Sequence, residues 1–133
     1  MALRWYSTVV DCVDVAAQAQ WWAHALGWQT VYAAEDEVVL VPAHASLELI
    51  RSTPWEQVPP GLVFVAVPEG KSVKNRLHLD LAPHTSDDRD AEIARLEALG
   101  ARRVDVGQSG DATWDVLADP EGNEFCVLSA RDS

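Results

Sequence analysis

A histidine and an aspartate, His78 and Asp80, lie two residues apart near the middle of the chain. They belong to the alternating run KNRLHLDL, Lys74–Leu81, which predicts a strand over residues 76–82. Since alternate side chains of a strand project from the same face, the imidazole and the carboxylate are expected to lie side by side. Such a pair could act as an acid, a base or an anchor for a ligand. It could also be a hydrogen-bonded pair that lines a cavity without a chemical role.

The basic residues around this run, Lys71, Lys74 and Arg76, are expected to form a solvated turn, with an anion clamp as the alternative. The sequence holds no glycine-rich phosphate loop and no Ser-His-Asp spacing. Its two cysteines, Cys12 and Cys126, lack CxxC spacing. In a reducing compartment they are expected to be buried thiols rather than a disulfide.

The charge of the chain limits its partners. Its 133 residues carry a formal net charge of −11, which argues against nucleic acid or an anionic membrane surface as a partner and favours neutral or cationic ligands. No apolar run approaches the roughly 20 residues that a membrane-spanning helix needs. The first residues, 1–5, lack the apolar core of a signal peptide, so a cytoplasmic protein is expected.

Two similar series of elements must position the candidate residues. The first half predicts a strand over Trp5–Val13, a helix from Asp14 to Gly27, and strands over Trp28–Ala33, Val38–Val41 and Leu62–Val67. The second half predicts the strand over 76–82, a helix that begins at Ser86 or Asp87 and ends at Gly100, and strands over Arg103–Val106, Thr113–Ala118 and Glu124–Ser129. Ser46–Ile50 could form a further strand, so that either this segment or 62–67 would close the first half.

Short matches between the halves indicate a duplication. Ala25-Leu26-Gly27 corresponds to Ala98-Leu99-Gly100, Val10-Asp11 to Leu79-Asp80, and Val39-Leu40 to Val116-Leu117. We therefore expect an α+β fold of two βαβββ modules, about 1–70 and 71–133. Because a repeated unit of this size cannot bury its own apolar face, the two modules should pack as a single domain.

The run Lys74–Leu81, the ending DPEGNEFCVL at Asp119–Leu128 and the repeat resemble the vicinal oxygen chelate superfamily. This superfamily contains the glyoxalase and bleomycin-resistance-like proteins, and the match is to its bacterial glyoxalase-like subgroup. The resemblance covers nearly the whole chain. It implies that the two modules form a curved mixed sheet around a cavity and that the protein is a homodimer.

Many members of this superfamily bind a divalent metal through one residue from the first and one from the last strand of each module. Carried over by position, these places fall on His78 and Cys126 in module two, and on Val9 and Phe64 in module one. With two apolar residues among the four, no resident metal or other cofactor is expected. The remaining metal candidates are His78, Glu124 and Cys126, with Glu48 added if Ser46–Ile50 closes module one.

The aromatic residues favour a binding cavity, since six tryptophans are more than two helix faces explain. His78 is the candidate catalytic residue. The residues expected to line the pocket are Val9, Trp55, Phe64, Asp80, Trp114, Glu124 and Cys126.

Three functions remain open at this point. The first is a metal-independent, glyoxalase-like protein that binds a small hydrophobic or aromatic molecule and either sequesters it or transforms it as a lyase or isomerase. The second is a lyase or isomerase that depends on a divalent metal. The third is a ligand-sensing or interaction module.

Overall fold

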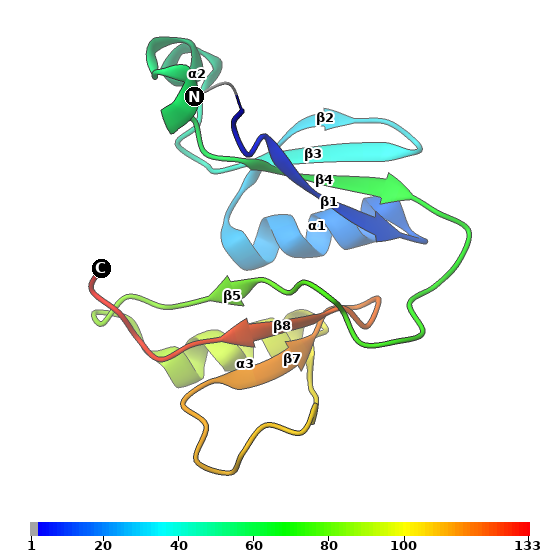
Figure 1. Ribbon diagram of the computed structural model, residues 1–133, viewed down its shortest axis with the longest axis vertical. Coiled ribbons are helices and arrows are strands. Elements are labelled where there is room, and N and C mark those ends of the chain that lie inside the picture. Colours follow the sequence, from blue (N-terminus) through cyan, green and yellow to red (C-terminus); the bar gives the residue numbers. More distant parts are fainter. Residues whose placement is uncertain (1–2) are drawn as a thin grey trace. The chain divides into compact units, whose positions relative to one another are not determined.

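The chain forms two compact units, one ending at Gly70 and the other beginning at Lys71 (Figure 1). The computed structural model describes residues 3–133. The strands and the long helix of each unit follow the order βαβββ and form one four-stranded mixed sheet, and the first unit adds two short helices before its last strand. This confirms the predicted α+β class and the duplication. Among the described residues, no helix is long and apolar enough to span a membrane.

The first unit pairs its first and last strands in parallel. Its elements are β1 (Ser7–Cys12), α1 (Val15–Leu26), β2 (Gln29–Ala33), β3 (Glu37–Val41), α2 (Leu47–Ser52), the 3-10 helix η1 (Trp55–Gln57) and β4 (Gly61–Ala66). The strand order is β1-β4-β3-β2. β1 and β4 run parallel, whereas β3 is antiparallel to both of its neighbours.

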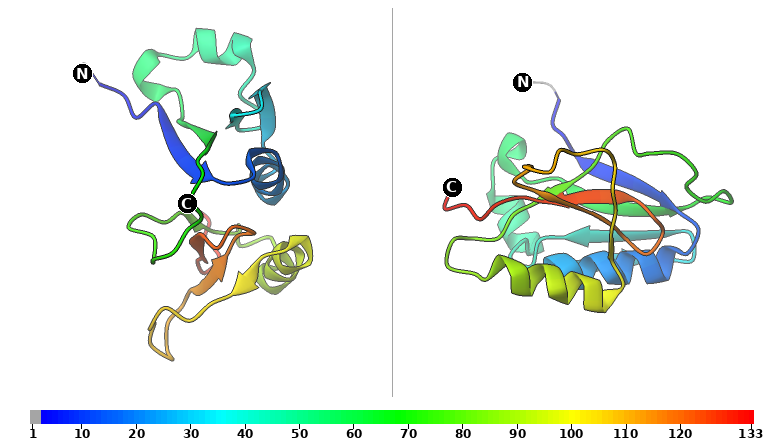
Figure 2. Two further views of the ribbon diagram at one scale, coloured as in Figure 1. Left: turned by 90° about the vertical axis from the view of Figure 1, so that its right-hand side faces the viewer. Right: turned by 90° about the horizontal axis from the view of Figure 1, so that it is seen from below.

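The second unit repeats this topology with shorter strands. Its elements are β5 (Asp80–Leu81), α3 (Arg89–Leu99), β6 (Arg102–Arg103), β7 (Asp115–Ala118) and β8 (Glu124–Val127). The order β5-β8-β7-β6, with β5 and β8 parallel, matches the first unit place for place. Figure 2 shows each long helix lying along one face of the sheet of its own unit.

Helix α1 has the ends that the sequence predicts. The Asp14 side chain accepts a hydrogen bond from the Ala17 amide at 3.1 Å, and Gly27 ends the helix with a left-handed φ of 66°. A residue with a side chain would be strained at this φ, which is why glycine suits the position. Val15, Ala19 and Trp22 recur at helical spacing and are buried, so they form the packed face of the helix.

Helix α3 begins one or two residues later than predicted, because Asp88 rather than Ser86 or Asp87 caps it through the Ala91 amide. Ile93 and Leu96 are buried, whereas Leu99 is 38% exposed. Six positions separate Leu99 from Ile93, which turns its side chain about 120° away around the helix.

The possible strand over Ser46–Ile50 is wrong, because this segment begins helix α2. The Ser46 side chain accepts a hydrogen bond from the Leu49 amide at 3.0 Å and so caps the helix. Glu48 stands in the first turn and is exposed. β4 is the strand that pairs with β1 and completes the first unit, which removes the reason for treating Glu48 as a metal ligand.

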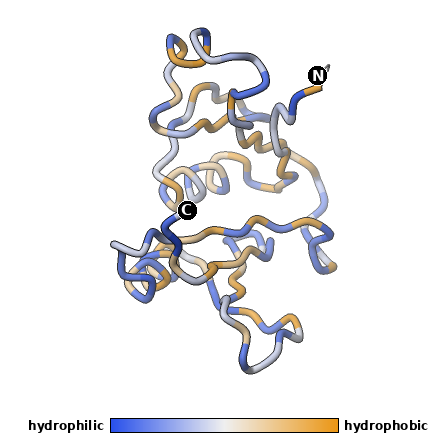
Figure 3. Tube along the Cα trace, turned by 60° about the vertical axis from the view of Figure 1, so that its left-hand side comes forward, coloured by the Kyte–Doolittle hydropathy of each residue, from blue (hydrophilic) through white to orange (hydrophobic). Residues whose placement is uncertain are grey.

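Apolar side chains of the strands form the core of each unit. Figure 3 shows hydrophobic residues concentrated along the strands. In the first unit Leu40 and Phe64 are fully buried, and in the second unit Leu117 and Phe125 are buried to the same degree. Since strand side chains alternate, one face of each strand supplies the core while the residues between are left for the opposite face.

Candidate functional site

The second unit contains a pocket of about 440 Å³. Its apolar wall consists of Val106, Trp114, Val116 and Leu128. Its polar and charged residues are Lys74, His78, Asp80, Gln108, Glu124 and Cys126, and the backbone of Gly107 completes the lining. Val116 and Cys126 face each other in the β7–β8 ladder, and Glu124 precedes Cys126 by two residues. All three therefore belong to the same face of the sheet.

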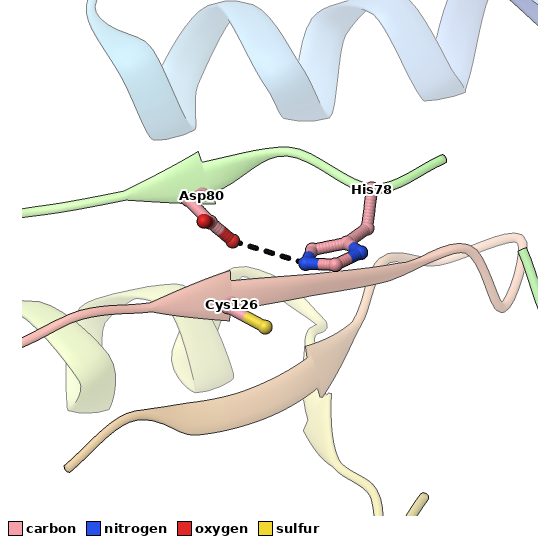
Figure 4. Close-up of side chains that lie close together, drawn as sticks. All are labelled: His78, Asp80 and Cys126. Carbon is pink, nitrogen blue, oxygen red and sulfur yellow. Dashed lines mark ion pairs between the residues drawn. The ribbon is translucent and has the colours of Figure 1, made fainter. Parts of the chain in front are cut away.

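The strand register brings His78, Asp80 and Cys126 together (Figure 4). Asp80 lies opposite Cys126 in the parallel β5–β8 pair. His78 Nε2 is 3.2 Å from Asp80 Oδ1. One potential ligand atom from each of the three residues lies within 4.8 Å of those from the other two. His78 and Asp80 therefore lie side by side as the sequence predicts, and the side chain of Cys126 lies next to them.

The predicted strand over 76–82 is much shorter than expected, since β5 contains Asp80 and Leu81. His78 precedes the strand. The Leu79 carbonyl still accepts a hydrogen bond from the Cys126 amide at 3.0 Å, which keeps the backbone extended next to β8. His78 and Asp80 therefore remain on one side of the chain. Their side chains are 43% and 48% exposed, so both can meet a ligand or water.

Cys126 is held as a neutral thiol. Burial raises the pKa of the Cys126 thiol, and the charge of Asp80 and a hydrogen bond to it raise the pKa further, while Lys74 acts in the opposite direction. The thiolate is the reactive form of cysteine. The side chain is also buried. We therefore do not assign Cys126 as a nucleophile.

Glu124 faces the segment that precedes His78. Lys71 Nζ lies 3.0 Å from Glu124 Oε1, and the Asn75 amide donates to Oε2 at 3.1 Å. The Asn75 side chain also donates to the Glu124 carbonyl at 3.2 Å. Burial alone would raise the pKa of Glu124, but the hydrogen bonds from Lys71 and Asn75 and the charge of Lys71 lower it overall. Both carboxylate oxygens already have partners, which makes Glu124 a poor metal ligand.

The other predicted pocket residues divide between the units. Trp114 lines the pocket of the second unit with its indole partly exposed. Val9, Phe64 and Trp55 belong to the first unit. Val9 is exposed on β1, whereas Phe64 is fully buried in the core. Trp55 stands in η1, where the Arg4 guanidinium lies 3.9 Å from its ring centroid.

The register also corrects the match between the modules. Asp11 lies opposite Val65 in the β1–β4 pair, as Asp80 lies opposite Cys126 in the β5–β8 pair. The counterpart of Cys126 is therefore Val65 and not Phe64, which is one residue earlier and on the other face.

Sequence reasoning missed several pocket residues. Val106, Gly107 and Gln108 lie in the loop that follows β6. Gln108 turns this loop back on itself, since its side chain accepts from the Val106 amide at 2.9 Å. Because a loop has no hydrophobic periodicity, its sequence does not indicate which of its residues will line a pocket. Lys74 could have been found from the sequence, because it belongs to the basic residues that were considered as an alternative anion-binding site.

The donor set of His78, Asp80 and Cys126 fits a borderline metal ion. Nitrogen, oxygen and sulfur ligands at tetrahedral spacing are typical of Zn²⁺, while Mg²⁺ and Ca²⁺ prefer oxygen alone. Three protein ligands with a fourth position open are the arrangement of catalytic zinc sites. The thiol would have to lose its proton for this, against the raised pKa of Cys126.

A family model described as the glyoxalase-like domain matches residues 7–128. The chain belongs to this family. The match spans both units and includes every residue of the pocket. No curated protein matches the sequence.

Several solved bacterial proteins have the same fold. A glyoxalase/bleomycin resistance protein/dioxygenase family enzyme from Burkholderia phytofirmans PsJN has a TM-score of 0.68 and 16% identity, over 96% of this chain and 98% of that chain. A mutant of the fosfomycin resistance protein FosX from Listeria monocytogenes, complexed with Mn(II) and 1S,2S-dihydroxypropylphosphonic acid, has a TM-score of 0.67 and 10% identity, over 98% and 91%. FosX from Mesorhizobium loti has a TM-score of 0.67 and 11% identity, over 96% and 92%. At these identities the similarity establishes the fold.

Proposed function

We propose that the chain is a small-molecule-binding protein whose pocket takes a ligand with a small hydrophobic or aromatic body. The observation that carries this proposal is the combination of an apolar wall with the His78–Asp80 pair in one cavity of about 440 Å³. Small-molecule sites are concave and mostly apolar, with a few polar groups that orient the ligand. The half-exposed indole of Trp114 provides a flat surface for an aromatic ring.

His78 anchors the ligand in this proposal. His78 Nε2 lies 3.2 Å from Asp80 Oδ1, which leaves Nδ1 as the ring nitrogen available to the ligand. The same arrangement suits a sequestering protein and a metal-independent lyase or isomerase in which His78 moves a proton. The assembly is proposed to be a homodimer, as the family resemblance implies, and its location to be the cytoplasm.

Titration with benzyl alcohol, a neutral aromatic probe, tests the pocket. At roughly 10 mM, a probe with a dissociation constant of about 1 mM nearly saturates its site. We expect shifts of the backbone amide signals of Val116 and Cys126 in ¹H–¹⁵N spectra. His78→Ala should weaken binding severalfold, whereas His44→Ala, in an exposed loop of the first unit, should leave it unchanged. An absence of shifts in the second unit would contradict the proposal and favour an interaction module.

A lyase or isomerase that depends on a divalent metal is the second candidate, and the convergence of His78, Asp80 and Cys126 favours it. A metal bound there would polarise an oxygen of the substrate. His78, Asp80 and Cys126 would hold the metal, while the apolar wall would exclude water from the bound substrate.

Metal analysis of protein purified without chelator tests this candidate, and less than about a tenth of an equivalent would count against it. Cobalt substitution gives an independent readout. A thiolate-to-cobalt absorption band should appear in the wild type and disappear in Cys126→Ser, while Cys12→Ser, in the core of the first unit, should keep it.

A further inference from the structure

The irregular segment Lys71–Leu77, called the strap below, begins the second unit and leads to His78. Two of its residues are tied to Glu124 at the start of β8, Lys71 by an ion pair and Asn75 by two hydrogen bonds. These contacts join positions about 50 residues apart in sequence. They hold the strap against the edge of the sheet at the point where the pocket begins.

Glu124 is well suited to hold the strap. Its side chain is 12% exposed, and each carboxylate oxygen meets a donor from the strap. Hydrogen bonds to a charged, partly buried group are stronger than those between neutral groups. Lys71 neutralises the carboxylate, so Glu124 contributes little negative charge to the pocket that it borders.

Lys74 lies between the two tied residues and lines the pocket. Its ammonium has no ion-pair partner among residues 3–133. Of the two carboxylates in the pocket, Glu124 is paired with Lys71, and Asp80 lies 3.2 Å from His78 Nε2. The charge of Lys74 is near enough to Cys126 to act on the thiol. Lys74 is exposed and lines the pocket, so its ammonium is open to contact with a ligand.

We propose that Glu124 is a positioning residue that holds the strap at the pocket, and that Lys74 selects ligands in which an apolar body carries an anionic group such as a carboxylate. This inference rests on the proposed small-molecule function and specifies its ligand class. It also reverses the preference that the net charge of −11 suggests. Repulsion from distant charges is screened beyond about 10 Å at ordinary salt concentrations, whereas a direct contact between Lys74 and a ligand anion acts within that distance.

Three probes with one ring and different charge test the selection: benzoate, benzyl alcohol and benzylamine. We expect benzoate to bind about fivefold more tightly than benzyl alcohol, the ratio that corresponds to a partly exposed ion pair. Benzylamine should bind most weakly. Lys74→Met keeps the length of the side chain and removes its charge. This variant should abolish the preference for benzoate and change the affinity for benzyl alcohol by less than about twofold.

Arg76→Met is the matched control, because it removes an equal charge from the strap at an exposed residue outside the pocket lining. It should keep the preference for benzoate. An equal loss of preference in Arg76→Met and Lys74→Met would overturn the inference, since the selection would then come from net charge and not from contact.

Two variants test the role of Glu124 from either end of the ion pair. Glu124→Gln and Lys71→Met should each lower the ratio of benzoate to benzyl alcohol affinity while benzyl alcohol still binds. In Glu124→Gln the Asn75 amide proton should move upfield as its hydrogen bond weakens. An unchanged ratio in both folded variants would overturn the positioning role.

The outcomes separate this inference from the proposed function. If benzyl alcohol binds in the pocket and benzoate binds no more tightly, the anionic ligand class is wrong and the binding function stands. If none of the three probes binds, the proposed function fails and the inference fails with it.

Discussion

The two units place different chemistry on the same framework. Each pairs its first and last strands in parallel, and the register aligns Asp11 with Asp80 and Val65 with Cys126. By the same alignment, Val9 corresponds to His78 and Val63 to Glu124. The first unit thus carries three valines at places where the second carries an imidazole, a carboxylate and a thiol.

The opposite face of the same strands shows no such difference. Phe64 and Phe125 occupy equivalent positions, one residue before Val65 and Cys126, and both are buried. This position is buried in the core of both units, and the same residue fills it. The fold therefore constrains the residue types on the core face of these strands, whereas the residues on the opposite face can differ and can form a functional site.

The largest effects should come from the core, where the units are alike. Phe64→Ala and Phe125→Ala should each destabilise the protein by about 3–5 kcal/mol, because each leaves a cavity among fully packed neighbours. Urea unfolding followed by circular dichroism measures both. A loss below about 1 kcal/mol in one variant would show that its unit tolerates the cavity and that the two cores are not equivalent.

Glu124→Val, which installs the residue of the first unit, should cost about 1–2 kcal/mol at neutral pH because Lys71 and the Asn75 amide lose their acceptor. The pKa of Glu124 is lowered by folding from its ordinary value of 4.5. Its stabilising effect is therefore present above that value and is lost as the pH falls through the lower pKa of the folded state. Urea unfolding of both proteins over the acid range should show the difference shrinking; a constant difference would contradict this role.

Cys126 should react slowly with iodoacetamide in the native protein, and Asp80→Asn should raise its rate a few-fold, because loss of the carboxylate lowers the pKa of the thiol. Mass spectrometry of the digested protein distinguishes Cys126 from Cys12. Asp11→Asn, at the equivalent place in the first unit, is the control and should leave the rate at Cys126 unchanged. An equal acceleration in both variants would mean that each substitution destabilises the protein and exposes Cys126, so that the charge of Asp80 is not the cause.

The smallest effect is expected from Val9→His, which places in the first unit the residue type that the second unit has at the equivalent position. Val9 is 56% exposed and lies two residues before Asp11, so the stability should change by no more than about 0.5 kcal/mol. Thermal unfolding measures this change. A loss of several kcal/mol would show that the aliphatic places of the first unit are needed for packing.

Local signals predicted most of the framework. Asp14 and Gly27 mark the ends of α1 because capping and left-handed backbone depend on a few neighbouring residues. Local signals also misled. Ser46–Ile50 has an apolar character that suits a strand, but the Ser46 cap starts a helix there. The predicted match of Val39-Leu40 with Val116-Leu117 is displaced by two residues, since the register sets Val38 and Leu117 opposite equivalent phenylalanines.

The sequence by itself determined the duplicated α+β fold, the ends of α1 and the pairing of His78 with Asp80, because each depends on periodicity or on residues close together in the chain. The tertiary structure decided which strand completes the first unit, that Cys126 lies beside Asp80, and that Glu124 binds Lys71 and Asn75. These contacts join segments about 50 residues apart. Strand register sets them, and a shift of one residue would move every side chain to the other face.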